Sequence, residues 1–198
     1  MDTFLTIDQL AEGLYKDKGS KFIASVHHVE SAEQAMEIVA EYRKKYYDAR
    51  HVCYAYMLGA ERDVFRANDD SEPSGTAGRP ILGQINSAGL TDVLVIVVRY
   101  FGGILLGTSG LITAYKSAAA DAIANAKIVE KIIEGRVEVR FGYSEMSYVM
   151  RVVKETQARI IEQEQLADCR IVVAVRRDMV EGFVTRFKDV KGIVYKLL

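Results

Sequence analysis

The chain has little of several features that mark membrane, secreted or metal-binding proteins. Its 198 residues include two cysteines, three histidines and two prolines, and its formal net charge is -1. Cys53 and Cys169 lie far apart in the chain, so we expect no disulfide framework and a reducing, cytoplasmic location. The longest uncharged span, Tyr100 to Tyr115, is too short for a membrane helix, which needs roughly 20 mostly apolar residues. We therefore expect no membrane role.

A net charge near zero also gives no general attraction to nucleic acid or anionic lipid, because long-range steering needs an excess of one sign. The N-terminal stretch MDTFLTIDQLAEGLY carries acidic residues where a signal peptide needs a basic region, so we expect no export. With 49% hydrophobic residues, the chain has enough apolar surface for packed cores. The composition thus predicts a soluble globular protein whose binding sites must come from local clusters.

Hydrophobic patterns predict an α+β domain over residues 1–130. We expect strands at residues 21–29, 51–58 and 93–98, and residues 63–67 as a hairpin partner. The run VLVIVV has no polar residue, which indicates a central strand covered on both faces. Ser31 is placed to cap a helix over residues 32–47. A second helix follows residue 110, with a buried stripe made of Leu111, Ala114, Tyr115, Ala118 and Ala122.

The sequence pattern of residues 131–198 predicts a second domain with the order β-α-β-β-α-β. The expected strands are residues 136–141, 158–167, 169–177 and 192–198, and the expected helices are residues 145–157 and 178–190. This order is typical of the ferredoxin-like fold, a four-stranded sheet with two helices on one face. The segment IVEKIIEG, which ends at Gly135, is expected to be a linker or a shared strand.

The segment RYFGGILLGTSGL joins the most apolar predicted strand to the alanine-rich helix and contains four glycines. Two interpretations remain open. The glycines can form a tight turn of positive φ that Thr108 or Ser109 caps, and residue types alone favour this interpretation. Alternatively, the helix N-terminus and the flexible backbone can bind a phosphate. The glycine spacing matches neither a P-loop nor a dinucleotide-binding fingerprint.

A second glycine-rich segment, residues 68–80, is the longest predicted loop and contains both prolines. Its hydroxyls, glycine amides and arginine are the groups of an anion-binding nest, although all of them are also common turn residues. If this loop lies beside the glycine-rich elbow, the two form one patch able to bind a phosphodiester or an acidic peptide. The residues predicted to bind an anion or nucleic acid are Ser74, Gly75, Thr76, Gly78, Arg79, Arg99, Tyr100, Gly102, Gly103, Gly107, Thr108, Ser109 and Lys116.

Metal and catalytic sites have weaker support in the sequence. His51 and Cys53 share one face of a predicted strand, but a zinc site needs further ligands. Three carboxylates in the loop, Asp69, Asp70 and Glu72, are of the type that binds Mg²⁺, although such runs are ordinarily solvated. No G-x-S-x-G elbow is present. We therefore expect no metal, no cofactor and no catalytic residue.

Four ordered motifs resemble the signature of the IMPACT family: KGSKFIASV, RHVCYAY, EPSGTAGRPIL and GLTDVLVIVVRYFGGILLG. The residues after them resemble the extra C-terminal domain of the bacterial YigZ/YvyE branch, which is similar to the last domain of elongation factor G. The resemblance implies that the first domain is similar to the second domain of a small-subunit ribosomal protein, with helices on one face of its sheet. Eukaryotic members of the family regulate translation.

Two classes of function follow from these observations. The first is a translation-regulatory binding protein that contacts RNA or a ribosome-associated protein through the glycine-rich patch, with no obligatory small-molecule ligand. The alternative is a phosphoryl-transfer or phosphorolytic enzyme that uses the same patch for phosphate, because enzymes of the related fold bind phosphate with a Gly/Ser loop at a helix start. The absence of a convincing catalytic pair favours the binding protein over the enzyme.

Overall fold

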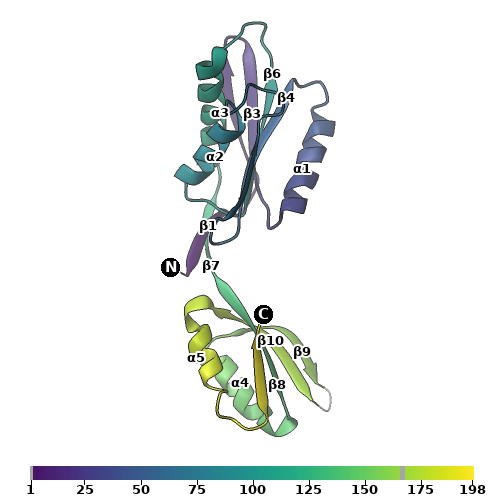
Figure 1. The fold of residues 1–198 in the computed structure, drawn as a ribbon, viewed down its shortest axis with the longest axis vertical. Coiled ribbons are helices and arrows are strands. Elements are labelled where there is room, and N and C mark those ends of the chain that lie inside the picture. The colour runs from purple at the N-terminus through teal and green to yellow at the C-terminus, as the bar shows by residue number, and fades with distance from the viewer. Residues whose placement is uncertain (1, 166–167) are drawn as a thin grey trace. The chain divides into compact units, whose positions relative to one another are not determined.

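The computed structural model describes residues 2–165 and 168–198, which fold into two compact units (Figure 1). The larger unit is Phe4–Lys131, and the smaller one comprises Ile132–Leu198 together with the N-terminal residues up to Thr3. Each unit has its own hydrophobic core. No helix in the described ranges is long and apolar enough to span a bilayer.

The larger unit is built on a five-stranded antiparallel sheet in the order β2-β3-β6-β4-β5. Its strands are β2 (Ala11–Asp17), β3 (Ser20–His28), β4 (His51–Leu58), β5 (Val64–Asn68) and β6 (Val93–Tyr100). The middle strand is β6, and its apolar run from Val93 to Val98 is fully buried. A strand without polar alternation is stable there because both faces of the sheet are covered.

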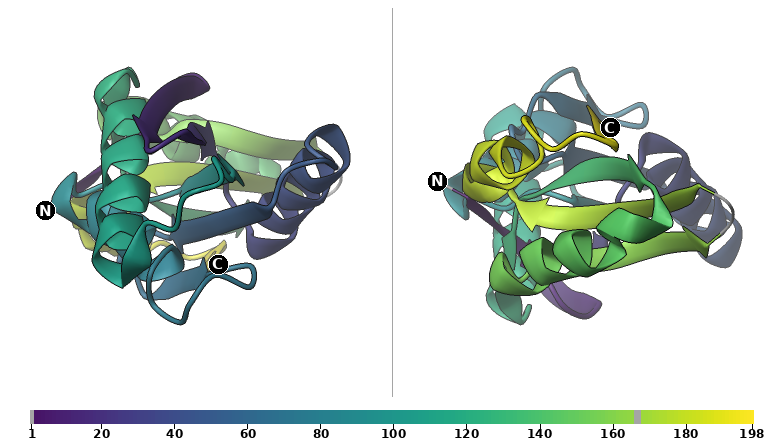
Figure 2. Two further views of the ribbon diagram at one scale, coloured as in Figure 1. Left: turned by 90° about the horizontal axis from the view of Figure 1, so that it is seen from above. Right: turned by 90° about the horizontal axis from the view of Figure 1, so that it is seen from below.

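Three helices cover this sheet: α1 (Ala32–Lys45), α2 (Gly78–Ser87) and α3 (Gly107–Ala124). Helices α2 and α3 pack on one face, and all five residues of the stripe predicted for α3 are buried. The mixed α+β class is thus confirmed, but one detail differs. Helix α1 packs through Ala35 and Val39 on the opposite face, so the helices do not all lie on one side (Figures 1 and 2).

Several elements differ from the sequence predictions. Strand β2 was not predicted, and β1 (Thr3–Ile7), which pairs with β7 (Ile128–Ile132), was also missed. The predicted loop 68–80 is shorter than expected because α2 begins at Gly78. Pro80 fits in the first turn of α2, where a missing N–H costs no intrahelical hydrogen bond.

The smaller unit has a four-stranded antiparallel sheet in the order β11-β8-β10-β9, as the ferredoxin-like prediction requires. Its elements are β8 (Glu134–Phe141), η1 (Tyr143–Glu145), α4 (Met146–Glu155), β9 (Arg159–Gln165), β10 (Cys169–Arg176), η2 (Arg177–Met179), α5 (Val180–Thr185) and β11 (Ile193–Leu197). Both α-helices bury side chains against the same face of the sheet, through Val149 and Val153 of α4 and Phe183 of α5. The last two residues of the strand predicted at 158–167 lie outside the described residues.

Candidate functional site

A pocket of about 430 Å³ opens where the end of β6 lies beside the start of β4. The sheet register pairs His51 directly with Arg99, and both side chains lie on the face covered by α2 and α3. The loop after β5 and the segment before α3 complete the walls. We call it the Glu72 pocket, and it is lined by Arg50, His51, Ser71, Glu72, Pro73, Arg99, Phe101, Leu105, Leu106, Gly107, Thr108 and Leu111.

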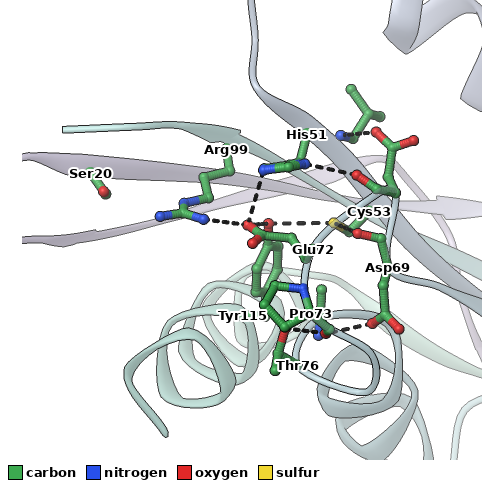
Figure 3. Close-up of polar contacts among 12 residues, drawn as sticks. Ser20, His51, Cys53, Asp69, Glu72, Pro73, Thr76, Arg99 and Tyr115 are labelled. Carbon is green, nitrogen blue, oxygen red and sulfur yellow. Dashed lines mark hydrogen bonds and ion pairs between the residues drawn. The ribbon is translucent and has the colours of Figure 1, made fainter. Parts of the chain in front are cut away.

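The Glu72 carboxylate lies at the centre of a buried polar network (Figure 3). Its Oε1 accepts a hydrogen bond from Nη1 of Arg99 at 2.5 Å and one from the Tyr115 hydroxyl at 2.7 Å. Glu72 and Arg99 are only 8% and 5% exposed, so each charge is removed from water and depends on the other. The pair therefore fixes the loop after β5 to the end of β6.

His51 adds a second basic group to this network. Its Nδ1 lies 2.7 Å from the Asp70 carbonyl oxygen, which can only accept a hydrogen bond, so Nδ1 carries a proton. Its Nε2 lies 3.7 Å from Oε1 of Glu72. A proton on Nε2 makes an ion pair with the carboxylate, and without that proton Nε2 can accept a hydrogen bond from a ligand in the pocket.

Two weakly acidic groups behind Glu72 keep their protons. Burial raises the pKa of the Cys53 thiol, and the nearby carboxylate of Glu72 raises it further. Burial, together with Cys53 and Glu72, raises the pKa of the Tyr115 hydroxyl in the same way. Neither group is activated as a nucleophile, because a reactive thiol needs a lowered pKa.

The Arg99 guanidinium is incompletely satisfied. It donates one hydrogen bond, from Nη1, and its buried Nε has no hydrogen-bond partner among the described residues. Its carbon Cζ lies 5.5 Å from the ring centre of Phe22 and 5.7 Å from that of Phe101. Buried arginines whose N–H groups are not all hydrogen-bonded within the protein often bind anions.

The predicted anion nest in the loop after β5 is occupied by the protein itself. The backbone N–H groups of Gly75, Ala77 and Gly78 donate to the Asp69 carboxylate at 2.8, 3.0 and 2.8 Å. Asp69 therefore satisfies the amides at and just before the start of α2, where the N-cap residue Ala77 provides no side-chain hydrogen bond. The Thr76 hydroxyl is buried and donates to the Pro73 carbonyl oxygen at 2.6 Å. These groups are not open to a ligand.

The pKa of Asp69 reflects this arrangement. Burial alone raises the pKa, but the three amide hydrogen bonds and the charge of Arg79 outweigh burial and lower it below the ordinary value of 3.8. A carboxyl group with a lowered pKa stabilises the folded state fully above the ordinary value, and this stabilisation is lost as the pH falls through the lowered pKa.

We therefore expect Asp69→Asn to lower the free energy of unfolding by roughly 0.5–2 kcal/mol at pH 7, as for a lost N-cap. The difference from the parent protein should shrink as the pH falls below 3.8, where Asp69 itself becomes protonated. Urea unfolding at a series of pH values measures both effects. Asp63→Asn, at an exposed aspartate, is the matched control. An equal loss for Asp69→Asn at every pH would contradict the assigned role.

The glycines of the elbow have different roles. Gly102 packs so closely on the β2–β3 hairpin that a Cβ there would lie 1.9 Å from the carbonyl carbon of Gly19. Gly103 and Gly107 have φ of 87° and 70° and open space around them, so conformation rather than packing requires glycine there. Neither Thr108 nor Ser109 caps α3, because both lie inside the helix and its N-cap is Leu106. The capping prediction was wrong, and within the described residues α3 has no side-chain cap at its N-terminus.

The structure brings the two predicted segments together at the Glu72 pocket, but only three of the thirteen predicted residues line it: Arg99, Gly107 and Thr108. Ser74, Arg79, Ser109 and Lys116 are exposed outside its lining. Tyr100 packs toward α1 on the other face of the sheet and donates to Asp48 at 2.9 Å. The acidic loop is not simply solvated either. Asp70 accepts from the Val52 amide and from Arg43, and the described residues include no cluster of three metal-ligating groups.

Three pocket residues that the site prediction omitted belong to motifs already recognised in the sequence. Arg50 and His51 begin RHVCYAY, and Glu72 begins EPSGTAGRPIL. Only the register between β4 and β6 shows that His51 belongs to the site, because this register places His51 opposite Arg99. A strand register depends on pairing between residues far apart in the chain, so a single sequence does not disclose it.

The larger unit contains the match to a known domain. The model of the Impact N-terminal domain matches residues 18–123, more than half of the chain. An IMPACT family member from Haemophilus influenzae is 31% identical over 181 residues, covering 87% of this chain and 84% of that protein. The IMPACT family member YigZ from Escherichia coli is 32% identical over 174 residues, covering 87% and 85%.

A solved structure extends this likeness to the whole chain. The crystal structure of a hypothetical protein is similar with a TM-score of 0.77 and 29% sequence identity, and the match covers 100% of this chain and 97% of that one. Agreement in motifs, domain and two-unit architecture leads to one conclusion: the chain belongs to the IMPACT family.

Proposed function

We propose that this protein regulates translation in the cytoplasm by binding RNA, and that the Glu72 pocket takes up one nucleotide of that RNA. The resemblance of its motifs to those of the eukaryotic family members supports the role in translation. The observation that carries the RNA part is the lining of the pocket, which combines cationic side chains with exposed apolar surface.

The charges around the pocket favour an anion. Arg50 is exposed at its edge, and the first amides of α3 meet it at Gly107 and Thr108. Of the described residues that line the pocket, one has a carboxylate, Glu72, and that carboxylate already pairs with Arg99. Arginine and a helix N-terminus both bind phosphate oxygens well.

The apolar part of the lining suits a base. Phe101 and Leu105 are 45% and 83% exposed, which is unusual for such large apolar side chains next to a central strand. An aromatic face stacks on bases of any sequence, and each such stack contributes about 1–3 kcal/mol. The pocket volume of about 430 Å³ also lies within the range of roughly 300–1,000 Å³ seen for small-ligand sites.

A basic hairpin extends the surface beyond the pocket. Lys16, Lys18 and Lys21 are exposed on the hairpin between β2 and β3. This hairpin adjoins the elbow, because the Gly102 amide donates to the Ser20 hydroxyl at 3.1 Å. Lysines so placed can neutralise phosphates of a strand that leaves the pocket, a contact without sequence preference.

We expect Arg50→Gln to weaken RNA binding at least tenfold, since a hydrogen bond to a charged group contributes roughly 1.5–3 kcal/mol and about 1.4 kcal/mol is a factor of ten. The slope of log affinity against log salt should also fall by about 1, because one phosphate contact is lost. Filter binding of single-stranded RNA at several salt concentrations measures both quantities.

The matched control is Arg79→Gln, which removes an exposed arginine of the neighbouring α2 that does not line the pocket. It should leave affinity and slope close to those of the parent protein. RNA affinity without salt dependence, or equal effects of the two substitutions, would count against binding at the Glu72 pocket.

A further inference from the structure

We infer that the Glu72 pocket accepts the 3′-terminal ribonucleoside of an RNA, whose two neighbouring hydroxyls donate hydrogen bonds to the Glu72 carboxylate. This inference rests on the proposed RNA-binding function and specifies which part of the RNA enters the pocket. It is carried by the uneven use of the two Glu72 oxygens and by the difference between the floor and the rim of the pocket.

The protein uses only one oxygen of the Glu72 carboxylate. The contacts from Arg99, Tyr115 and His51 all go to Oε1. Oε2 receives no hydrogen bond or ion pair from the described residues, although Glu72 is 8% exposed and lines the pocket. Among the described residues, the fully buried side-chain nitrogen and oxygen atoms without a partner are Nε of Arg62 and Nε of Arg99. Oε2 of Glu72 is not one of them, so it remains open to accept a hydrogen bond from a ligand in the pocket.

The ligand group that suits Oε2 is a neutral donor, as a ribose hydroxyl is, rather than a further anion. A second negative group against Oε2 would meet the charge of Glu72 in a site largely removed from water, where repulsion is poorly screened. Within an RNA chain, adjacent free 2′ and 3′ hydroxyls occur only at the 3′-terminal ribose. A 5′ end and an internal nucleotide both lack this pair of donors.

The shape of the pocket also favours a chain end. Its floor is nearly buried: Glu72, Arg99, Leu106 and Leu111 are 8%, 5%, 9% and 6% exposed. Its rim contains the exposed residues Arg50, Phe101 and Leu105. A chain end can enter such a pocket directly, whereas an internal nucleotide needs the strand to bend in and out again on both sides. The terminal ribose then reaches the floor, while its 5′ phosphate remains near Arg50 and its base near Phe101.

The test compares RNAs that differ only at the 3′ end. Short oligoadenylates with a 5′ fluorophore are prepared with a 2′,3′-diol, a 3′-phosphate or a 2′,3′-dideoxy end, and their binding to the full chain is followed by anisotropy. We expect the 3′-phosphate to weaken binding at least tenfold, and the dideoxy end to weaken it severalfold. An internal 2′-O-methyl group should leave the affinity unchanged. No altered protein is needed, so loss of folding cannot obscure this result.

The variant Glu72→Gln tests whether Glu72 is the residue that distinguishes a 2′,3′-diol end from a 3′-phosphate end. In this variant the affinity ratio between diol and 3′-phosphate RNA should fall toward one, because an uncharged amide no longer repels a phosphate.

Equal binding of all three 3′ ends, with the dependence on Arg50 retained, would overturn the 3′-end inference and leave RNA binding in place. An unchanged ratio in folded Glu72→Gln would also overturn it. If none of the RNAs binds, or if Arg50→Gln has no effect on any of them, the proposed function itself fails.

Discussion

Replacing Arg99 alone, as in Arg99→Met, is expected to lower the free energy of unfolding of the larger unit by about 3–5 kcal/mol. The substitution leaves the Glu72 carboxylate at 8% exposure without its guanidinium partner. Methionine is long and flexible enough to fill most of the space, so the loss comes mainly from the unpaired charge rather than from a cavity. Urea unfolding, followed by circular dichroism and by hydrogen exchange of the β6 amides, measures this change.

The control is the double substitution Arg99→Met with Glu72→Met. Removing both partners leaves no buried charge, so the double variant should recover roughly 1–3 kcal/mol relative to Arg99→Met. Tyr115 then loses its acceptor, but its hydroxyl still lies 3.3 Å from the Cys53 sulfur. If the double variant is less stable than Arg99→Met, the Glu72–Arg99 pair does not have the energetic role assigned to it.

The fold was predictable wherever a local pattern decides the structure. The unbroken apolar run of β6 indicated a central strand, and the small residues of α3 indicated close packing on the sheet. Both patterns reflect burial, which is the dominant favourable contribution to folding. The β-α-β-β-α-β order of the smaller unit followed from the same kind of signal.

Elements with mixed patterns were missed. Burial alternates regularly along strand β2, but its residue types do not show this, because Leu14 lies on the exposed side and Gly13 is buried against the backbone of α3. The Leu14 amide of this edge strand donates to Asp121 of α3, 107 residues away. A strand held by contacts so distant in the chain has little local signal, because strand propensity depends strongly on context.

The candidate site was predictable in place but not in detail. The prediction that the loop after β5 and the elbow adjoin is consistent with the lining of the Glu72 pocket. The amides of that loop were expected to bind a ligand, but Asp69, from the same acidic run, binds them instead. Residue types show that an amide nest can form. They do not show whether an internal carboxylate or an external anion fills it.

Gly102 shows that a glycine predicted from the sequence to bind a ligand can be required for packing alone. A Cβ at this position would lie 1.9 Å from the Gly19 carbonyl carbon and 2.2 Å from the Ser20 nitrogen. Both are backbone atoms, so the clash cannot be relieved by rotating a side chain. The hairpin between β2 and β3 would have to move away from the elbow, and the hydrogen bond from the Gly102 amide to the Ser20 hydroxyl would break.

Gly102→Ala is therefore expected to lower the free energy of unfolding by about 3 kcal/mol, at the upper end of the usual cost of overpacking. Gly83→Ala is the matched control, because Gly83 lies within α2 with no atom near its missing Cβ. Alanine there should stabilise the protein by roughly 0.4–1 kcal/mol. Urea midpoints of the two variants should thus move in opposite directions. A shift of the same sign and size in both would mean that the elbow tolerates a side chain at Gly102, and that the hairpin does not depend on this contact for its position.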